Sequence, residues 1–218
     1  MERQEILDKA KWIEFPSASL NYKQYDGIEP AKVPMAESDP YRTWSMNQHH
    51  FPPMSHFRNT MPVIANVLDF CFREEDFLFK PQKFDEYDLT MPYPKFPCFY
   101  DAECLSDGTR KFSGITYDEL TKYEKSDGTE YHRLYRFFHD SSIVVNRNIK
   151  PKRSLFISGD SHMIPVVPML TYYFKTIVYI DNRKQAKVFD KVKDIVFTDV
   201  LFCLWQNSID FYTVQNLK

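Results

Sequence analysis

The last third of the chain predicts an α/β fold in which helices flank a parallel sheet. Residues 155–158 form a short apolar run, 176–180 are rich in β-branched residues, and 195–204 contain a third apolar segment, so each indicates a strand. Between them, 166–173 and 185–193 have the pattern of helices. Strands that alternate with helices in this way form a parallel sheet with right-handed crossovers.

The size and composition of the chain fit one such domain. It has 218 residues, of which 43% are hydrophobic, so a proper core can form and wholesale disorder is disfavoured. We expect a single domain over 1–218, with the strand-helix-strand core over 151–218 and a long, irregular, loop-rich half over 1–150.

Charge and hydropathy disfavour two classes of partner. The net charge is −2 and the pI is near 6.3, so nothing attracts the protein electrostatically to nucleic acid. No apolar stretch approaches the ~20 residues that a membrane-spanning helix needs. Residues 1–12 lack the apolar core of a secretory signal, which predicts a cytoplasmic protein unless the chain is the trimmed form of an exported one.

In the loop-rich half, a few segments have enough pattern to predict an element. Residues 1–13 predict a short amphipathic helix, and 61–72 predict a second helix that starts near a proline. Repeated prolines over 73–100 predict an extended loop with aromatic anchors. The segment 117–123 predicts a short helix, and 131–138 predict a strand or a helix.

The cysteines do not have the spacing of a zinc site. Cys98 and Cys104 could pair in an oxidising compartment, although four cysteines in a chain this long are also compatible with free thiols. Cys203 lies in an apolar run and is expected to be an inert core residue.

The clearest functional signal is the turn that follows the strand at 155–158. There the apolar run breaks at Gly159 and continues as Asp160, Ser161 and His162 before the next helix. In open α/β sheets, chemistry takes place just past the carboxyl ends of the strands, where backbone N–H groups converge. Ser161 could therefore present a nucleophilic hydroxyl while neighbouring N–H groups hold an oxyanion; the alternative is a helix N-cap.

The neighbours of Ser161 have two interpretations each. Asp160 could bind backbone amides of the turn or act directly in catalysis, and His162 could line an oxyanion site or face solvent. The pair Asp160 and His162 also has the Asp-x-His spacing that opens a two-metal phosphoesterase site. That chemistry needs further histidine ligands downstream, and the sequence contains none after His162.

Four blocks of the last third, taken in order, resemble a known family. They are Phe156–His162, Pro168 to Phe174, Tyr179–Arg183 and Phe197–Leu201. This ordered pattern, matched mainly over 153–208, resembles the SGNH-hydrolase-like proteins of the AlgX/AlgJ and DHHW group, which handle acetyl groups on bacterial exopolysaccharides. The resemblance implies an SGNH-hydrolase-like parallel sheet flanked by helices, with Ser161 as the catalytic nucleophile.

The same resemblance predicts an Asp-x-His-Trp block upstream, and the nearest counterpart is Gln48-His49-His50-Phe51 in the poorly periodic segment 15–62. His50 falls on the catalytic histidine of the family, whereas Gln48 replaces its aspartate and Phe51 its tryptophan. In a serine protease, an amide in place of the triad carboxylate lowered turnover about ten-thousandfold. Asp39 or Glu37 could supply the missing carboxylate.

Further residues could bind substrate. Arg183 matches an arginine of the family and could bind a carboxylate or sugar oxygen, or pair with Asp181 or Asp199. Asn146 could supply an oxyanion-hole amide. Four aromatic residues of the first half could stack on sugar rings or anchor loops to the core: Tyr93, Phe96, Phe99 and Tyr100.

Together these features predict serine-dependent transfer or hydrolysis of an acyl group, most simply acetyl, on a carbohydrate. The partners would be a polysaccharide and an acyl donor, and the chemistry needs neither a metal nor a dissociable cofactor. The alternative is a glycan-binding or assembly protein that has the fold without the triad. Gln48 favours this alternative, and the intact Gly159-Asp160-Ser161 sequence favours the enzyme.

Overall fold

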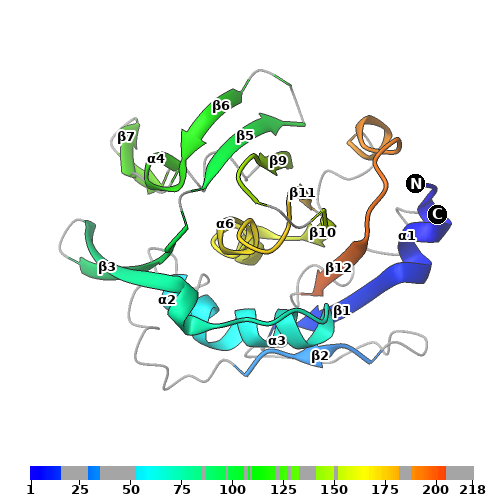
Figure 1. Cartoon of the computed structure of the whole chain (residues 1–218), viewed down its shortest axis with the longest axis horizontal. Helices are drawn as coiled ribbons and strands as arrows, with labels where there is room; N and C mark the ends of the chain where they lie inside the picture. Colours follow the sequence, from blue (N-terminus) through cyan, green and yellow to red (C-terminus); the bar gives the residue numbers. More distant parts are fainter. Residues whose placement is uncertain are drawn as a thin grey trace.

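The computed structural model describes residues 1–15, 29–34, 53–84, 87–96, 98–105, 108, 110–120, 123–126, 129–132, 141–149, 152–181 and 188–204, for some of them, including Ser161, the backbone alone. An eight-stranded sheet forms the centre, in the order β2-β1-β12-β10-β11-β9-β5-β6 (Figure 1). Its strands are β1 (Ala10–Glu14), β2 (Ala31–Lys32), β5 (Phe99–Cys104), β6 (Lys111–Thr116), β9 (Ser142–Asn146), β10 (Ser154–Gly159), β11 (Thr176–Asp181) and β12 (Asp199–Leu204).

The parallel core expected from the last third of the sequence is confirmed. Strand β10 pairs in parallel with β11 on one side and with β12 on the other. Its residues are buried throughout, which is typical of a strand covered on both faces of a parallel sheet. β10 therefore occupies the centre of the fold, and its carboxyl end carries the Gly159-Asp160-Ser161 turn.

The sheet is mixed rather than wholly parallel. Strand β9 runs antiparallel to β11, and β5 and β6 continue the antiparallel part outward. These three strands come from the half of the chain in which loops were expected. Their segments are short, so sequence periodicity alone did not distinguish them from loops.

The predicted helix over 1–13 is half correct. Helix α1 (Arg3–Lys9) ends where β1 begins, and β1 pairs in parallel with β12. Ile13 is fully buried, and the ring of Trp12 stacks on Phe202 with centroids 4.6 Å apart. The spacing of apolar residues over 10–14 suits either a helix or a strand, and pairing with the buried strand β12 makes this segment a strand.

The extended loop predicted over 73–100 is wrong for most of its length. Residues Phe77–Phe84 (β3) and Tyr87–Pro94 (β4) form an antiparallel two-stranded ribbon, preceded by the 3-10 turn η2 (Glu74–Asp76). Prolines are excluded from central strands because they cannot donate to the ladder. In a two-stranded ribbon each strand has one free edge, so a proline nitrogen can face away from the partner. A second ribbon joins β7 (Tyr123–Ser126) to β8 (Thr129–His132).

The other helices are short. The predicted helix over 61–72 is confirmed as α3 (Met61–Val67), which continues α2 (Pro53–Ser55) and the π-helical turn η1 (His56–Thr60). The helices predicted over 117–123 and 166–173 are present as α4 (Tyr117–Leu120) and α6 (Val167–Leu170); over 185–193 the described residues form only η5 (Phe189–Lys191). None of the helices in the described ranges combines the length and hydrophobicity that a bilayer crossing requires.

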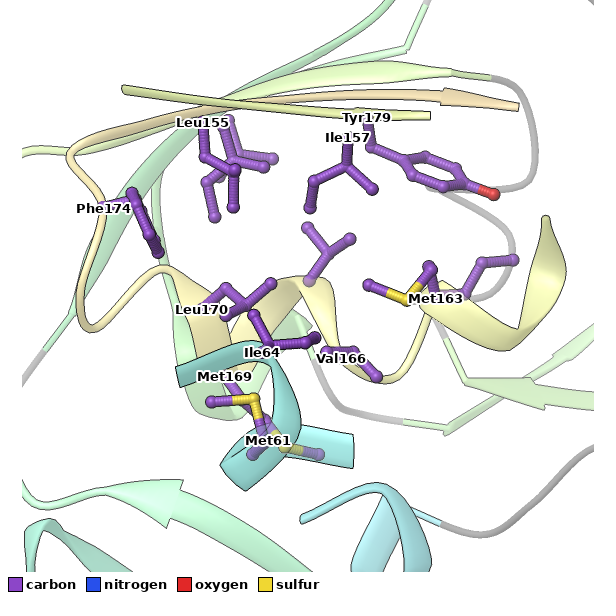
Figure 2. Packing of buried hydrophobic residues seen from close by; sticks show 14 of the residues in the cluster. Met61, Ile64, Leu155, Ile157, Met163, Val166, Met169, Leu170, Phe174 and Tyr179 are labelled. Carbon is purple, nitrogen blue, oxygen red and sulfur yellow. The ribbon is translucent and has the colours of Figure 1, made fainter. Parts of the chain in front are cut away.

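Alternating side chains of β10 build a core on each face of the sheet. Leu155 and Ile157 pack with Met163 of η3 and with Leu170 and other residues of α6 and α3, as Figure 2 shows. Phe156, on the opposite face, packs against the segments around η5 and β12. This two-sided burial explains why the strand signal was strongest here.

None of the cysteines in the described chain forms a disulfide. Cys98 precedes β5 and Cys104 ends it, so six positions of extended chain, roughly 20 Å, separate them. A disulfide requires Cα atoms within about 7 Å. A bridge between Cys98 and Cys104 is therefore excluded.

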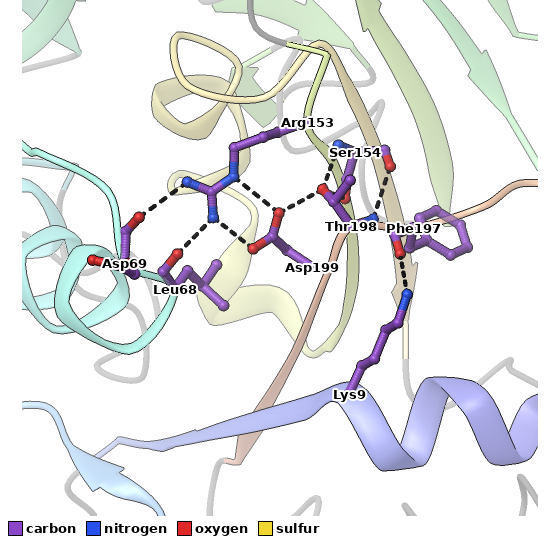
Figure 3. Close-up of polar contacts among 8 residues, drawn as sticks. All are labelled: Lys9, Leu68, Asp69, Arg153, Ser154, Phe197, Thr198 and Asp199. Carbon is purple, nitrogen blue, oxygen red and sulfur yellow. Dashed lines mark hydrogen bonds and ion pairs between the residues drawn. The ribbon is translucent and has the colours of Figure 1, made fainter.

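Arg153 connects the amino ends of β10 and β12 to the end of helix α3 through hydrogen bonds. Its guanidinium donates to both carboxylate oxygens of Asp199, to the carbonyl of Leu68 and to that of Asp69 (Figure 3). Leu68 and Asp69 directly follow α3, so the guanidinium satisfies carbonyls that the helix end leaves open. The contacts hold the amino ends of β10 and β12 against the helix that covers them.

We predict that Arg153→Ala lowers the free energy of unfolding by about 1.5–3 kcal/mol. The reason is that the partly buried carboxylate of Asp199 and the carbonyls at the end of α3 lose their hydrogen-bond donor. Urea denaturation measures the loss. Arg58→Ala is the matched control, since the Arg58–Glu74 pair is exposed, and it should cost less than about 1 kcal/mol. Equal losses in the two variants would contradict the role given to Arg153.

Candidate active site

The turn after β10 is held by backbone hydrogen bonds. Asp160 leaves the strand, and Ser161–Met163 form the single 3-10 turn η3 that leads to α6. The carbonyl of Asp160 accepts bonds from the N–H of Met163 at 3.0 Å and from the hydroxyl of Tyr179 at 2.8 Å. The backbone of Ser161 thus has a fixed place at the carboxyl edge of the parallel strands.

Asp160 and His162 form a bonded pair around Ser161. One carboxylate oxygen of Asp160, Oδ1, accepts from the backbone N–H of His162 and contacts its Nδ1, both at 2.9 Å. An ionised carboxylate can only accept, so Nδ1 carries a proton in this arrangement. Asp160 therefore binds a backbone amide of the turn, which was one of the two interpretations of this residue.

His162 is buried and does not face solvent, so that interpretation is wrong. The side chain is 4% exposed, and its ring lies 5.8 Å from the ring of Phe15, which follows β1. Phe15 also contacts His56 edge-on at 5.8 Å. Phe15, which packs against His56 of η1, thus helps to bury the imidazole of His162 beside the turn.

His56 was missed by sequence reasoning. It is fully buried in η1, and its Nδ1 lies 3.1 Å from Oγ1 of Thr60. Its position among the apolar residues Met54, Phe57 and Met61 could have indicated that His56 is buried.

Gly159 permits the close approach of the turn to the strand. A Cβ at this position would lie 2.9 Å from Cγ of Met163 and 3.4 Å from Cβ of Cys203. Cys203 is buried, as predicted, and burial raises the pKa of its thiol, with a further contribution from the charge of Asp160. Cys203 is therefore a packing residue beneath the turn rather than a nucleophile.

Two further carboxylates end parallel strands of the sheet at this edge. Glu14 ends β1 and Asp181 ends β11, in register with Gly159, and both are buried. The N–H of Asp181 donates to the hydroxyl of Ser141 at 2.9 Å. Among the described residues, no three His, Cys, Asp or Glu side chains gather in a way that could hold a metal ion.

Two other candidates, Asn146 and Asp199, lie away from the turn. Asn146 ends β9 beside the start of β11, at the opposite edge of the sheet, where its amide donates to the carbonyl of Thr171 at 2.8 Å. It is thus a structural residue, and the proposed oxyanion role is withdrawn. Asp199, at the start of β12, pairs with Arg153. The candidates Arg183, Asp39, Gln48, His49 and His50 lie outside the described residues.

Comparison with known proteins shows the fold. No family model and no curated protein matches the chain. Among solved structures, Bacillus cereus PatB1 aligns with a TM-score of 0.62 at 15% identity, covering 99% of this chain and 88% of PatB1. A DHHW family protein from Eubacterium siraeum aligns with a TM-score of 0.58 at 17% identity, covering 95% and 81%.

A PatB1 structure with a sulfonyl adduct also aligns, with a TM-score of 0.53 at 16% identity, over 77% of this chain and 61% of that one. These likenesses confirm the predicted α/β fold with its central sheet and flanking helices. At such identities they support the resemblance stated above at the level of the fold alone.

We predict that Gly159→Ala destabilises the protein by about 1–3 kcal/mol, because the added methyl group overpacks the contact with Met163. Thermal or urea unfolding provides the measurement. The double variant Gly159→Ala/Met163→Ala should lose less than the sum of the two single losses, because it relieves the clash. Strict additivity would show that the close approach to Met163 is not the cause.

Proposed function

We propose that this protein transfers an acetyl group to, or hydrolyses it from, a carbohydrate hydroxyl, with Ser161 as the nucleophile. The observation that carries the proposal is the position of the Gly159-Asp160-Ser161 turn at the carboxyl end of the central strand. Chemistry is typical of this position in open α/β sheets. The shared fold with PatB1 and the DHHW protein supports the proposal.

In this mechanism the hydroxyl oxygen of Ser161 attacks the acyl carbonyl and gives its proton to a histidine. Collapse of the tetrahedral intermediate expels the donor's leaving group, which takes that proton, and leaves an acyl-serine. A sugar hydroxyl, or water in hydrolysis, then attacks the acyl-serine and restores the serine. By the family pattern, His50 is the proton acceptor, and a carboxylate such as Asp39 would orient it in place of Gln48.

Two backbone N–H groups of the turn already donate hydrogen bonds within the protein, so they are not available to an oxyanion. The N–H groups of His162 and Met163 are bound to Asp160, to its carboxylate and its carbonyl respectively. The backbone N–H of Ser161 itself is one donor that this turn could offer to an oxyanion. The bonds to Asp160 would hold that N–H in place throughout the reaction.

Ser161→Ala should abolish both turnover and acylation. We expect p-nitrophenyl acetate hydrolysis to fall by at least about a thousandfold, and the acetyl adduct seen by intact-mass spectrometry to disappear. A sulfonyl fluoride is a suitable second probe, given the sulfonyl adduct on PatB1. Ser113→Ala, on exposed strand β6, should retain both properties. No adduct, and equal rates in all three proteins, would favour the non-catalytic glycan-binding alternative.

His50→Ala should lower the rate of acetyl ester hydrolysis by about 10²–10⁴-fold, because the serine loses its proton acceptor. His49→Ala, one residue away, is the matched control and should retain most of the activity. The pH profile of kcat/KM measures the titration of the base. If His162→Gln removed the activity while His50→Ala did not, the imidazole held by Asp160 would be the acceptor instead.

A further inference from the structure

A cleft lies at the edge of the sheet opposite the Ser161 turn. Its volume is about 630 Å³, within the range of roughly 300–1,000 Å³ typical of small-molecule sites. Residues that precede β10 or follow α6 line it, including Arg153, Tyr172 and Tyr173. Since β10 is six residues long, about 20 Å of strand separates this cleft from the turn.

Aromatic rings form much of the wall of this aromatic cleft, which we define by Phe70, Phe96, Tyr172 and Tyr173. The rings of Phe70 and Tyr173 lie 4.4 Å apart at 34°, and those of Tyr172 and Tyr173 lie 5.1 Å apart at 79°. Phe96 remains 61% exposed. The packed rings of one wall are thus fixed, and the exposed ring of Phe96 adds apolar surface that a ligand can cover.

The charges that line the cleft are neutralised within the protein. The guanidinium of Arg73 donates from Nε and Nη2 to the two oxygens of Asp76, each at 3.1 Å. Arg153, also in the lining, is paired with Asp199. The cleft therefore offers no net charge for an ionic ligand to balance. A guanidinium has five N–H donors, so Arg73 retains hydrogen-bonding capacity beyond these two bonds.

The lining of the cleft also includes Tyr173, whose hydroxyl is buried. The hydroxyl of Tyr173 is buried beside the backbone N–H of Arg73, and it donates no hydrogen bond to the described residues. Burial raises the pKa of Tyr173 well above its ordinary value, against the smaller opposing effect of that N–H. The hydroxyl is protonated at neutral pH, and because its oxygen is buried it takes no part in the binding proposed here.

We propose that the aromatic cleft binds a pyranose ring of a neutral saccharide. A pyranose has an apolar C–H face, which aromatic rings can cover, and a rim of hydroxyls that can donate to Asp76 and accept from Arg73. A purely apolar ligand would desolvate these polar groups without replacing their bonds to water, at a cost in affinity. The site is separate from Ser161 and does not depend on acetyl chemistry. On a long glycan it would anchor the chain and raise its effective concentration at the turn.

The test is a ligand-observed NMR titration of the whole protein with cellobiose, and with cyclohexylmethanol as a ring without the hydroxyl rim. We expect millimolar binding of cellobiose and at least about tenfold weaker binding of cyclohexylmethanol. Phe96→Ala and Tyr172→Ala should each weaken cellobiose binding about five- to tenfold. Phe79→Ala is the matched control, an exposed phenylalanine outside the cleft, and it should bind as the wild type does.

The proposal would be overturned by no cellobiose binding by the wild type, by equal binding of both probes, or by binding that survives Phe96→Ala and Tyr172→Ala. Ser161→Ala separates this site from the proposed acetyl chemistry. Cellobiose binding that persists in Ser161→Ala supports a cleft distinct from the turn, whether or not the wild type forms an acetyl adduct. Binding lost in Ser161→Ala alone would place the sugar at the turn and contradict the cleft.

Discussion

Burial of strand β10 on both faces is the constraint from which the other features follow. Parallel strands flank it, and its side chains alternate between two hydrophobic clusters. A parallel sheet needs cover on both faces, so the segment after Gly159 has to turn at once and return across one face as η3 and α6. Gly159 makes that sharp return possible, because a side chain there would collide with Met163. The position of Ser161 is thus a consequence of how the core is covered.

The two edges of the sheet have different chemistry. At the carboxyl edge, buried acids end the strands, and Asp160 uses its oxygens to fix the turn that carries Ser161. At the amino edge, Arg153 binds Asp199 and the end of α3, while tyrosines after α6 border the aromatic cleft. One rigid sheet therefore separates the site proposed for bond chemistry from the site proposed for sugar binding.

The local sequence pattern predicted the strands correctly where both faces of a strand are buried. It was misleading where pairing with a single partner strand determines the conformation. The apolar runs of β10 and β11 were predictable because buried parallel strands have few alternatives. The β3–β4 ribbon was not, because its prolines disfavour a strand in isolation and are tolerated only at free edges. Segment 10–14 had helical spacing and became a strand through its pairing with β12. Of the aromatic residues considered for sugar stacking, Tyr93 and Tyr100 proved to be core, whereas Phe96 and Phe99 are exposed.

By itself the sequence determined the parallel α/β core, the Gly159-Asp160-Ser161 turn at its carboxyl edge and the buried role of Cys203, because each depends on residues that are neighbours in the chain. Only the tertiary structure decided the mixed character of the sheet, the burial of His162 against Phe15, the structural role of Asn146 and the existence of the aromatic cleft. These features join residues that are far apart along the chain, such as Phe70 with Tyr173, and Arg153 with Asp199. Their contacts depend on how strands pair and helices cover them, which local periodicity does not encode.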